Sequence, residues 1–330
     1  MIRRVIENVG SARPAQLPVP GPDGRLDPVA CAAYCESIAR SRFHNFPVAS
    51  MFLPKHLAPH VFALYAFART ADDFVEDPAY EGRRVAELDA WEDRLRRLYH
   101  GEVDHPVFVA LADVLDKCDL PFAPLYDFLS ALRLDLTTTR YPTWNELVSW
   151  TRLAAGPIGR SMLYVFGVRD AARQRYAEEL SVALALTGLW QDIAHDLDRG
   201  RVYVPQEDLQ HFGVSEEDLF ARRQTDAVTA LLRYQCARTR AILARARPLM
   251  DLVDETLGVE VAMAWYGGER ALEVLERRVK RGPGGAPPWS WIGGLPGARG
   301  IYAGRARFTA RDKADVLIHA IARRGLNWTL

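Results

Sequence analysis

The chain has 330 residues, of which 49% are hydrophobic and 25% are charged. This composition is ordinary for a folded globular protein, and the length is ample for a buried core. Lys and Arg together number 42, as do Asp and Glu. The formal net charge is therefore zero, without the basic excess typical of nucleic-acid-binding proteins, and no nucleic-acid partner is expected.

The N-terminus and the cysteines indicate the compartment. Residues 1–25 are rich in Pro and Gly, which predicts an irregular arm, and they lack the apolar core of a signal peptide. The most apolar stretches are too short to span a bilayer. The four cysteines include no CxxC pair, which is typical of buried thiols in a reducing compartment. We therefore expect a cytoplasmic protein, and peripheral contact with a membrane surface stays open.

Helical signals follow the arm. Asp27-Pro28 predicts an N-cap and a first helical residue. Thr143-x-x-Glu146 has the form of a capping box, and Ser215-x-x-Asp218 is a weaker version. Apolar residues at i, i+3, i+4 and i+7 predict helices over 57–77, 83–99, 122–137, 170–197, 224–254 and 257–281. Few runs alternate with period two, so the predicted fold class is all-α, a large bundle with buried central helices.

Two further features concern the middle and the end of the chain. Gly156-Pro157 predicts a helix break. Residues 282–300 are rich in Gly and Pro and contain two Trp, which indicates a linker or flap, and 311–324 has the pattern of an amphipathic helix. The expected organisation is an irregular arm (1–25), a helical domain (26–281), and a linker with a C-terminal helix (282–330). Docking of this last segment on a membrane is one hypothesis for its role.

The segment LYAFARTADDFVEDP (64–78) carries four carboxylates, Asp72, Asp73, Glu76 and Asp77. On a helix, residues four apart share a face, so they form two pairs of like charges. Such pairs destabilise a bare helix, and a bound hard cation would reverse the penalty because it prefers carboxylate oxygens. A solvated acidic helix end is the alternative, but the apolar lead-in VFALYAFA favours a buried helix.

The same stripe extends towards the N-terminus. Tyr65, Arg69, Asp72 and Glu76 are spaced i, i+4, i+7 and i+11, which places them on one helical face. An aromatic ring, a cation and two acids on one face suit a cluster of metal ions and a diphosphate.

The segment 184–205 repeats the theme. Asp192 and Asp196 are again four apart, after the apolar stretch SVALALTGL. Arg201, in the turn that follows, could supply a fixed cation for a phosphate oxygen. Magnesium typically uses one or two carboxylates with phosphates and water. Two facing acidic helices would therefore hold a diphosphate through bridging ions and neutralise it as its C–O bond breaks.

These segments resemble the squalene/phytoene synthase family, from about residue 42 to 280. That family has a DxxxD motif after Tyr-x-x-x-Arg, and a second DxxxD followed by a basic residue and Tyr. The matching positions here are Tyr65, Arg69, Asp72 and Glu76, then Asp192, Asp196, Arg201 and Tyr203. The resemblance implies the all-α isoprenoid-synthase fold with a central active-site cavity.

Within the family, the motifs look most like those of the hydroxysqualene synthases of bacterial hopanoid biosynthesis. The segments that carry this likeness are HNFPVAS (44–50), AAGPIGRSM (154–162) and WQDIAHDLDRGRVYVP (190–205). Family members that condense two farnesyl diphosphates usually read Asn-x-x-Arg-Asp in the second motif. This chain has Gly188 and Gln191 at those positions, and Gln191 fits the hydroxysqualene synthase subgroup better.

The motifs and the resemblance together give the candidate site. The catalytic candidates are Asp72, Asp73, Glu76, Asp192 and Asp196; the metal ligands are Asp72, Glu76, Asp192 and Asp196; the substrate contacts are Tyr65, Arg69, Asn45, Ser50, Gln191, Arg201 and Tyr203. Two or three Mg²⁺ ions are expected as cofactor, and no nicotinamide cofactor is expected, because no GxGxxG fingerprint opens a βαβ unit. Trp150 is a candidate for an aromatic cavity wall, with core packing as the alternative.

The resemblance also implies the reaction. Presqualene diphosphate would ionise with magnesium assistance, and water would capture the rearranged cation to give hydroxysqualene, on the way to squalene and hopanoids. The first alternative is a head-to-head synthase that forms presqualene diphosphate, squalene or phytoene. The second is a non-catalytic family member that acts as an assembly or binding protein. The expected partner is a prenyl diphosphate substrate, and contact with other enzymes of the same pathway stays open.

Overall fold

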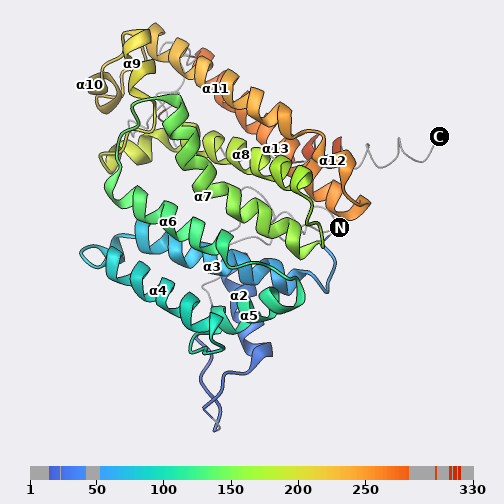
Figure 1. Ribbon diagram of the computed structural model, residues 1–330. Coiled ribbons are helices and arrows are strands. Elements are labelled where there is room, and N and C mark those ends of the chain that lie inside the picture. Colours follow the sequence, from blue (N-terminus) through green and yellow to red (C-terminus); the bar gives the residue numbers. More distant parts are fainter. Residues whose placement is uncertain are drawn as a thin grey trace, which may run out of the picture. The chain divides into compact units, whose positions relative to one another are not determined.

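The computed structural model describes residues 15–22, 24–41, 53–281, 302, 312–313, 315–317 and 319–320. Throughout this described part the regular elements are helices, so the predicted all-α fold class is confirmed. They are α2 (Pro28–Ser41), α3 (Ala58–Glu76), the 3-10 turn η1 (Pro78–Tyr80), α4 (Arg84–Tyr99), α5 (Pro106–Lys117), α6 (Ala123–Thr137), α7 (Trp144–Val165), α8 (Ala171–Asp198), α9 (Gln206–Phe212), α10 (Glu216–Phe220), α11 (Asp226–Ala246), α12 (Leu249–Leu252) and α13 (Glu255–Arg281) (Figure 1). Among the described residues, no helix combines the length and apolar character needed to cross a bilayer.

The predicted helix starts are confirmed by their caps. The carboxylate of Asp27 accepts hydrogen bonds from the backbone N–H groups of residues 29 and 30, both at 3.2 Å. Thr143 and Glu146 bond reciprocally, at 3.2 and 2.9 Å, ahead of α7. Ser215 and Asp218 form the same capping box ahead of α10. Each cap satisfies backbone donors that the first turn of a helix leaves without a partner.

The predicted break at Gly156-Pro157 is wrong, because α7 continues through it with Pro157 inside the helix. Proline removes one backbone hydrogen bond and costs about 3 kcal/mol in a helix interior. Close packing on both sides of the proline outweighs this cost. A Cβ atom on Gly156 would lie 2.8 Å from Glu178 Cγ, and the Ser161 hydroxyl donates to the carbonyl of Pro157 at 2.8 Å.

The chain divides into two compact units. The first comprises residues 1–136, 153–178 and 249–261, and the second comprises residues 137–152, 179–248 and 262–330. In the first unit α2, α3 and α5 pack on one another, and α4 packs on α3 and α5 (Figure 1). Its core is aromatic at the centre: Phe67 of α3 stacks on Trp91 of α4 at 6.0 Å between ring centroids, and Trp91 meets Phe108 of α5 edge-on at 4.6 Å.

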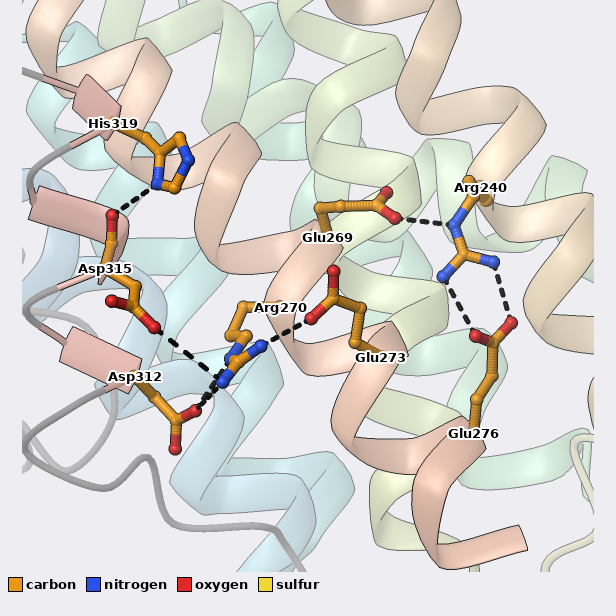
Figure 2. Close-up of polar contacts among 8 residues, drawn as sticks. All are labelled: Arg240, Glu269, Arg270, Glu273, Glu276, Asp312, Asp315 and His319. Atoms are coloured by element: carbon orange, nitrogen blue, oxygen red, sulfur yellow. Dashed lines mark hydrogen bonds and ion pairs between the residues drawn. The ribbon is translucent and has the colours of Figure 1, made fainter. Parts of the chain in front are cut away.

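The second unit is held by pairs of polar side chains between its helices. The indole N–H of Trp190 on α8 donates to the hydroxyl of Thr239 on α11 at 2.9 Å, and both residues are buried. Arg240 of α11 bonds to Glu269 and Glu276 of α13, each at 2.7 Å (Figure 2). Helix α11 is therefore fixed to a helix on each side.

The described residues between 312 and 320 are helical and lie against α13 (Figure 2). Arg270 of α13 donates to Asp312 at 2.7 Å, and only 6% of Asp312 is exposed. Val316 and Ala320, one and two turns further, are buried too. The apolar side of this segment is therefore covered within the second unit.

Candidate functional site

Helix α3 is apolar along most of its length and becomes acidic at its last turn. Residues 60–64, 66 and 67 are buried in the core of the first unit, whereas Tyr65 is half-buried and packs against that core. Asp72, Asp73 and Glu76 are partly buried, and the helix ends at Glu76. The predicted acidic face thus belongs to a packed helix, not to a solvated one.

Arg69 connects two of these carboxylates. Its Nη1 donates to Asp72 Oδ2 at 2.9 Å, and its Nη2 donates to Asp73 Oδ1. The spacing of three and four residues places all three side chains on one face of α3. We predicted this cluster from the sequence, but we expected Arg69 to contact only the substrate and not the neighbouring carboxylates.

The Asp72 carboxyl is strained electrostatically. Burial and the neighbouring Glu76 raise its pKa to about 7, and Asp73 and Asp135 add to the effect, whereas Arg69 opposes it. Asp135 lies on α6 with 6% of its surface exposed. Asp135 was not singled out from the sequence, because the segment SALRLDLTTT (130–139) contains no second acidic residue with which it could form a pair. An excess of negative charge on hard oxygen ligands is what a divalent cation such as Mg²⁺ fits.

The fourth carboxylate of the run has a different task. Asp77 lies beyond the end of α3, and its Oδ1 accepts the backbone N–H of Ala79 at 2.9 Å, which caps η1. Arg84 of α4 donates to the carbonyls of Phe74 and Val75. These contacts satisfy groups that the end of a helix leaves without partners, and so fix the last turn on which Asp72 and Glu76 lie.

The second acidic pair lies at the C-terminal end of α8. Asp196 and Gln191 are buried, with 9% and 7% of their surfaces exposed, and Asp192 is partly buried. The helix ends at Asp198. Gly200 follows with φ of +72°, and the backbone N–H of Arg201 donates to the carbonyl of Asp196 at 2.9 Å. This left-handed glycine ending reverses the chain directly after the acids.

The segment 139–142 holds the returning chain in place. The backbone N–H of Val202 donates to the carbonyl of Thr139 at 3.0 Å, and the side chain of Arg140 donates to the carbonyl of Gly200 at 2.6 Å. Arg140 also pairs with Glu216 through two bonds of 2.7 and 2.8 Å. Arg201 and Tyr203 are therefore carried on a well-fixed turn.

Three aromatic rings gather beside this turn. Tyr203 stacks on Trp150 of α7 and on Tyr141, with ring centroids 5.3 and 5.9 Å apart and interplanar angles of 25° and 20°. Arg201 Nη1 lies 3.5 Å from the Tyr203 hydroxyl. Tyr141 was not singled out from the sequence, since a lone Tyr before Pro142 carries no periodic signal. A cavity of about 10 Å³, enough for one water, lies between Asp196, Trp190 and the 201–204 segment.

The predicted site residues thus form two groups. The residues on α3 lie in the first unit, and Gln191, Asp192, Asp196, Arg201 and Tyr203 lie in the second. Of the second group, Asp196, Arg201 and Tyr203 line the same small cavity. Asn45 and Ser50 lie outside the described residues. Within the described part of the chain, no three His, Cys, Asp or Glu side chains are placed to hold a metal ion by themselves. A metal ion bound at either acidic end would therefore need further oxygen ligands, such as phosphate or water.

Comparison with known proteins adds to this geometry. Residues 39–291 match the family model described as squalene/phytoene synthase. The chain is 30% identical to a 15-cis-phytoene synthase of Synechococcus elongatus over 279 residues, which cover 79% of this chain and 90% of that protein.

Solved structures show the same fold. The squalene synthase HpnC from Alicyclobacillus acidocaldarius superposes with a TM-score of 0.72 at 36% identity, covering 77% of this chain and 95% of that one. A dehydrosqualene synthase in complex with a ligand superposes with a TM-score of 0.71 at 24% identity, covering 91% and 100%. The fold is therefore the all-α, isoprenoid-synthase type.

Proposed function

Because the chain belongs to the squalene/phytoene synthase family, we propose that it converts presqualene diphosphate and water to hydroxysqualene and diphosphate, with Mg²⁺ as cofactor. The observation that supports the metal and diphosphate part is the crowding of carboxylates at the end of α3, where the pKa of Asp72 is raised to about 7 despite its ion pair with Arg69. Carboxyls with pKa values perturbed in this way cluster at functional sites.

Both acidic helix ends would bind metal ions in this reaction. Asp72 and Glu76 on α3, with Asp192 and Asp196 on α8, would hold the ions. Bound Mg²⁺ supplies Lewis-acid neutralisation of the departing diphosphate. Arg201, on its fixed turn, donates hydrogen bonds to diphosphate oxygens, where a guanidinium matches the geometry of phosphate.

The remaining steps concern the carbon skeleton. The C–O bond breaks and both electrons leave with the diphosphate. Aromatic rings such as Tyr203, which stacks on Tyr141 and Trp150, stabilise a nearby cation through their faces and exclude stray water. The cyclopropylcarbinyl cation rearranges as C–C bonds of its three-membered ring migrate and the ring opens. A water oxygen then forms the new C–O bond, and its proton passes to the diphosphate. No electrons are gained or lost, so the reaction needs no reductant.

The choice of presqualene diphosphate rests on two supports. Gln191 is a neutral, buried amide directly before Asp192, where family members that join two farnesyl groups usually have Arg. The similarity to a squalene synthase at 36% identity supports a substrate of squalene length. The phytoene synthases at about 30% identity favour the alternative, a head-to-head synthase acting on farnesyl or geranylgeranyl diphosphate. A non-catalytic role is the weakest alternative, because all five motif carboxylates are present.

Substrate comparison tests the proposal. Purified full-length protein with Mg²⁺ is incubated with presqualene, farnesyl or geranylgeranyl diphosphate, and the lipid products are identified by mass spectrometry. We expect hydroxysqualene to form when presqualene diphosphate is supplied, and we expect neither farnesyl nor geranylgeranyl diphosphate to be consumed. Turnover of farnesyl or geranylgeranyl diphosphate would replace the proposal with the head-to-head alternative. If none of the three is consumed, the non-catalytic alternative is favoured. If Asp192→Asn turns over as well as the wild type, the second acidic pair is not required for the reaction.

A further inference from the structure

Arg69 lies among the carboxylates at the end of α3 and bonds to two of them. Its two terminal nitrogens donate to different partners, Nη1 to Asp72 at 2.9 Å and Nη2 to Asp73. The side chains of Arg69, Asp72 and Asp73 are 25%, 33% and 22% exposed, so solvent screens these ion pairs only in part. The guanidinium therefore already binds the carboxylate that the proposed metal site requires.

The acids of this cluster repel one another. Asp72, Asp73 and Glu76 each carry a negative charge when ionised, and Arg69 bonds to the first two of them. Asp72 and Glu76 are four residues apart on one helix face, so their repulsion is relieved by an ion that both can bind. Such an ion has to share Asp72 with Arg69 or displace it.

We propose that Arg69 is a counter-ion latch, meaning that it holds Asp72 and Asp73 in the metal-free protein and is displaced from Asp72 when a divalent cation binds. The latch rests on the proposed function, because it takes Asp72 as a metal ligand. Once released from Asp72, Nη1 is free for a diphosphate oxygen, while Nη2 keeps Arg69 in place through Asp73. Binding is thereby ordered, because metal binding creates the free donor that the diphosphate then uses.

The latch predicts opposite effects of one substitution on two ligands. Metal-free full-length protein is titrated with Mn²⁺, followed by its electron paramagnetic resonance signal. Arg69→Gln is expected to bind Mn²⁺ about fivefold more tightly than the wild type, because one competing ion pair is lost. With saturating Mn²⁺, the same variant is expected to bind inorganic pyrophosphate about tenfold more weakly, because a charge-assisted donor is gone.

Two further variants separate the latch from general electrostatics. Arg69→Lys keeps the charge but cannot fork onto two carboxylates, so it is also expected to bind Mn²⁺ more tightly than the wild type. Arg83→Gln is the matched control. Arg83 pairs with Glu87 at 3.0 Å at the start of α4, and its removal is expected to change Mn²⁺ affinity by less than about twofold.

The outcomes distinguish this inference from the function on which it rests. If wild type binds Mn²⁺ and Asp72→Asn does not, but both Arg69 variants bind it no more tightly than wild type, the latch is overturned and the metal site stands. An equal gain in Arg83→Gln also overturns the latch. If wild type binds no Mn²⁺, or Asp72→Asn binds it equally well, the metal assignment fails and the latch fails with it.

Discussion

Four neighbouring carboxylates at the end of α3 differ in what they touch, although the sequence presents them as one acidic run. Asp72 and Asp73 bond to Arg69, whereas Asp77 accepts a backbone N–H and caps η1. Glu76 acts on Asp72 through its charge. Residue type and spacing predict such a cluster. Because α3 ends at Glu76, however, Asp77 lies outside the helix and has a different role from the other three.

The contrast between Asp72 and Asp77 gives a matched pair of variants. Asp72→Asn is expected to lower turnover by about 10²–10³-fold, because a ligand for the leaving-group charge is lost. Asp77→Asn retains an acceptor for the cap and is expected to keep turnover within about threefold. Steady-state kinetics at saturating Mg²⁺ measures both effects. Equal loss in the two variants would show that the acidic run acts through bulk charge.

The same variant carries a stability prediction whose sign follows from the pKa of Asp72. A carboxyl with a raised pKa in the folded state costs stability as pH rises from about 4 to about 7. Metal-free Asp72→Asn is therefore expected to melt above the wild type at pH 8, and the difference is expected to vanish near pH 4. Thermal denaturation in the presence of a chelator measures it. A variant that melts below the wild type at pH 8 would contradict the electrostatic account.

At the scale of elements, His105 shows how one cap makes stability depend on pH. Its Nδ1 accepts the backbone N–H of Val107 at 3.2 Å at the start of α5, and its ring meets Trp91 edge-on at 5.0 Å. Only a neutral imidazole can accept that bond. Burial, with help from Arg94, lowers the pKa of His105 to about 4.

This cap predicts a loss of stability in mild acid. The stabilising contribution is complete above the unfolded-state pKa of about 6.5 and is lost as pH falls towards 4. Between pH 7 and pH 5 the free energy of unfolding of the wild type is expected to fall by about 1–2 kcal/mol more than that of His105→Asn, because Asn caps the helix without titrating. Urea unfolding at both pH values measures this. Parallel losses in the two proteins would place the pH dependence elsewhere.

The ion pair between Arg270 of α13 and Asp312 gives a second prediction at the scale of elements. Arg270 is 22% exposed and pairs with Asp312, whose side chain is 9% exposed. Arg270→Gln is expected to cost about 1–2 kcal/mol, because it leaves a buried carboxylate with a weaker partner. Arg277→Gln, at an exposed position on the same helix, is the control and is expected to be neutral. Chemical denaturation compares them, and equal stability of both variants would rule out a structural role for this ion pair.

The elements also show what the sequence could and could not predict. The bounds of α3 and α8, and the acids at their ends, followed from helical period and spacing, which are local properties. The continuous α7 did not, because the packing of Gly156 against Glu178 is a tertiary contact that outweighs the local preference of proline. Asp135 and Tyr141 were missed for a related reason: both matter through neighbours distant in sequence, and a single chain carries no signal of such contacts.

At the scale of the whole molecule, each acidic group is assembled within its own compact unit, the first on α3 and the second at the end of α8. The proposed function requires both groups to act on one diphosphate. Ligand-induced stabilisation tests this without an assay of turnover, because a ligand that binds the folded state raises the melting temperature by mass action.

Magnesium and inorganic pyrophosphate together are expected to raise the melting temperature more than the sum of their separate effects. Asp72→Asn and Asp196→Asn should each abolish that excess, and the double variant should lose no more than either single variant. Differential scanning calorimetry provides the measurement. Independent, additive losses in the two single variants would mean that the acidic ends bind separate ligands.

The most direct test of the account follows the oxygen of the product. Full-length protein, Mg²⁺ and presqualene diphosphate are incubated in H₂¹⁸O without a nicotinamide cofactor, and the extracted lipid is analysed by mass spectrometry. The account predicts hydroxysqualene that carries one ¹⁸O atom, with diphosphate released in equal amount. Unconsumed presqualene diphosphate, or a product without solvent oxygen, would contradict it.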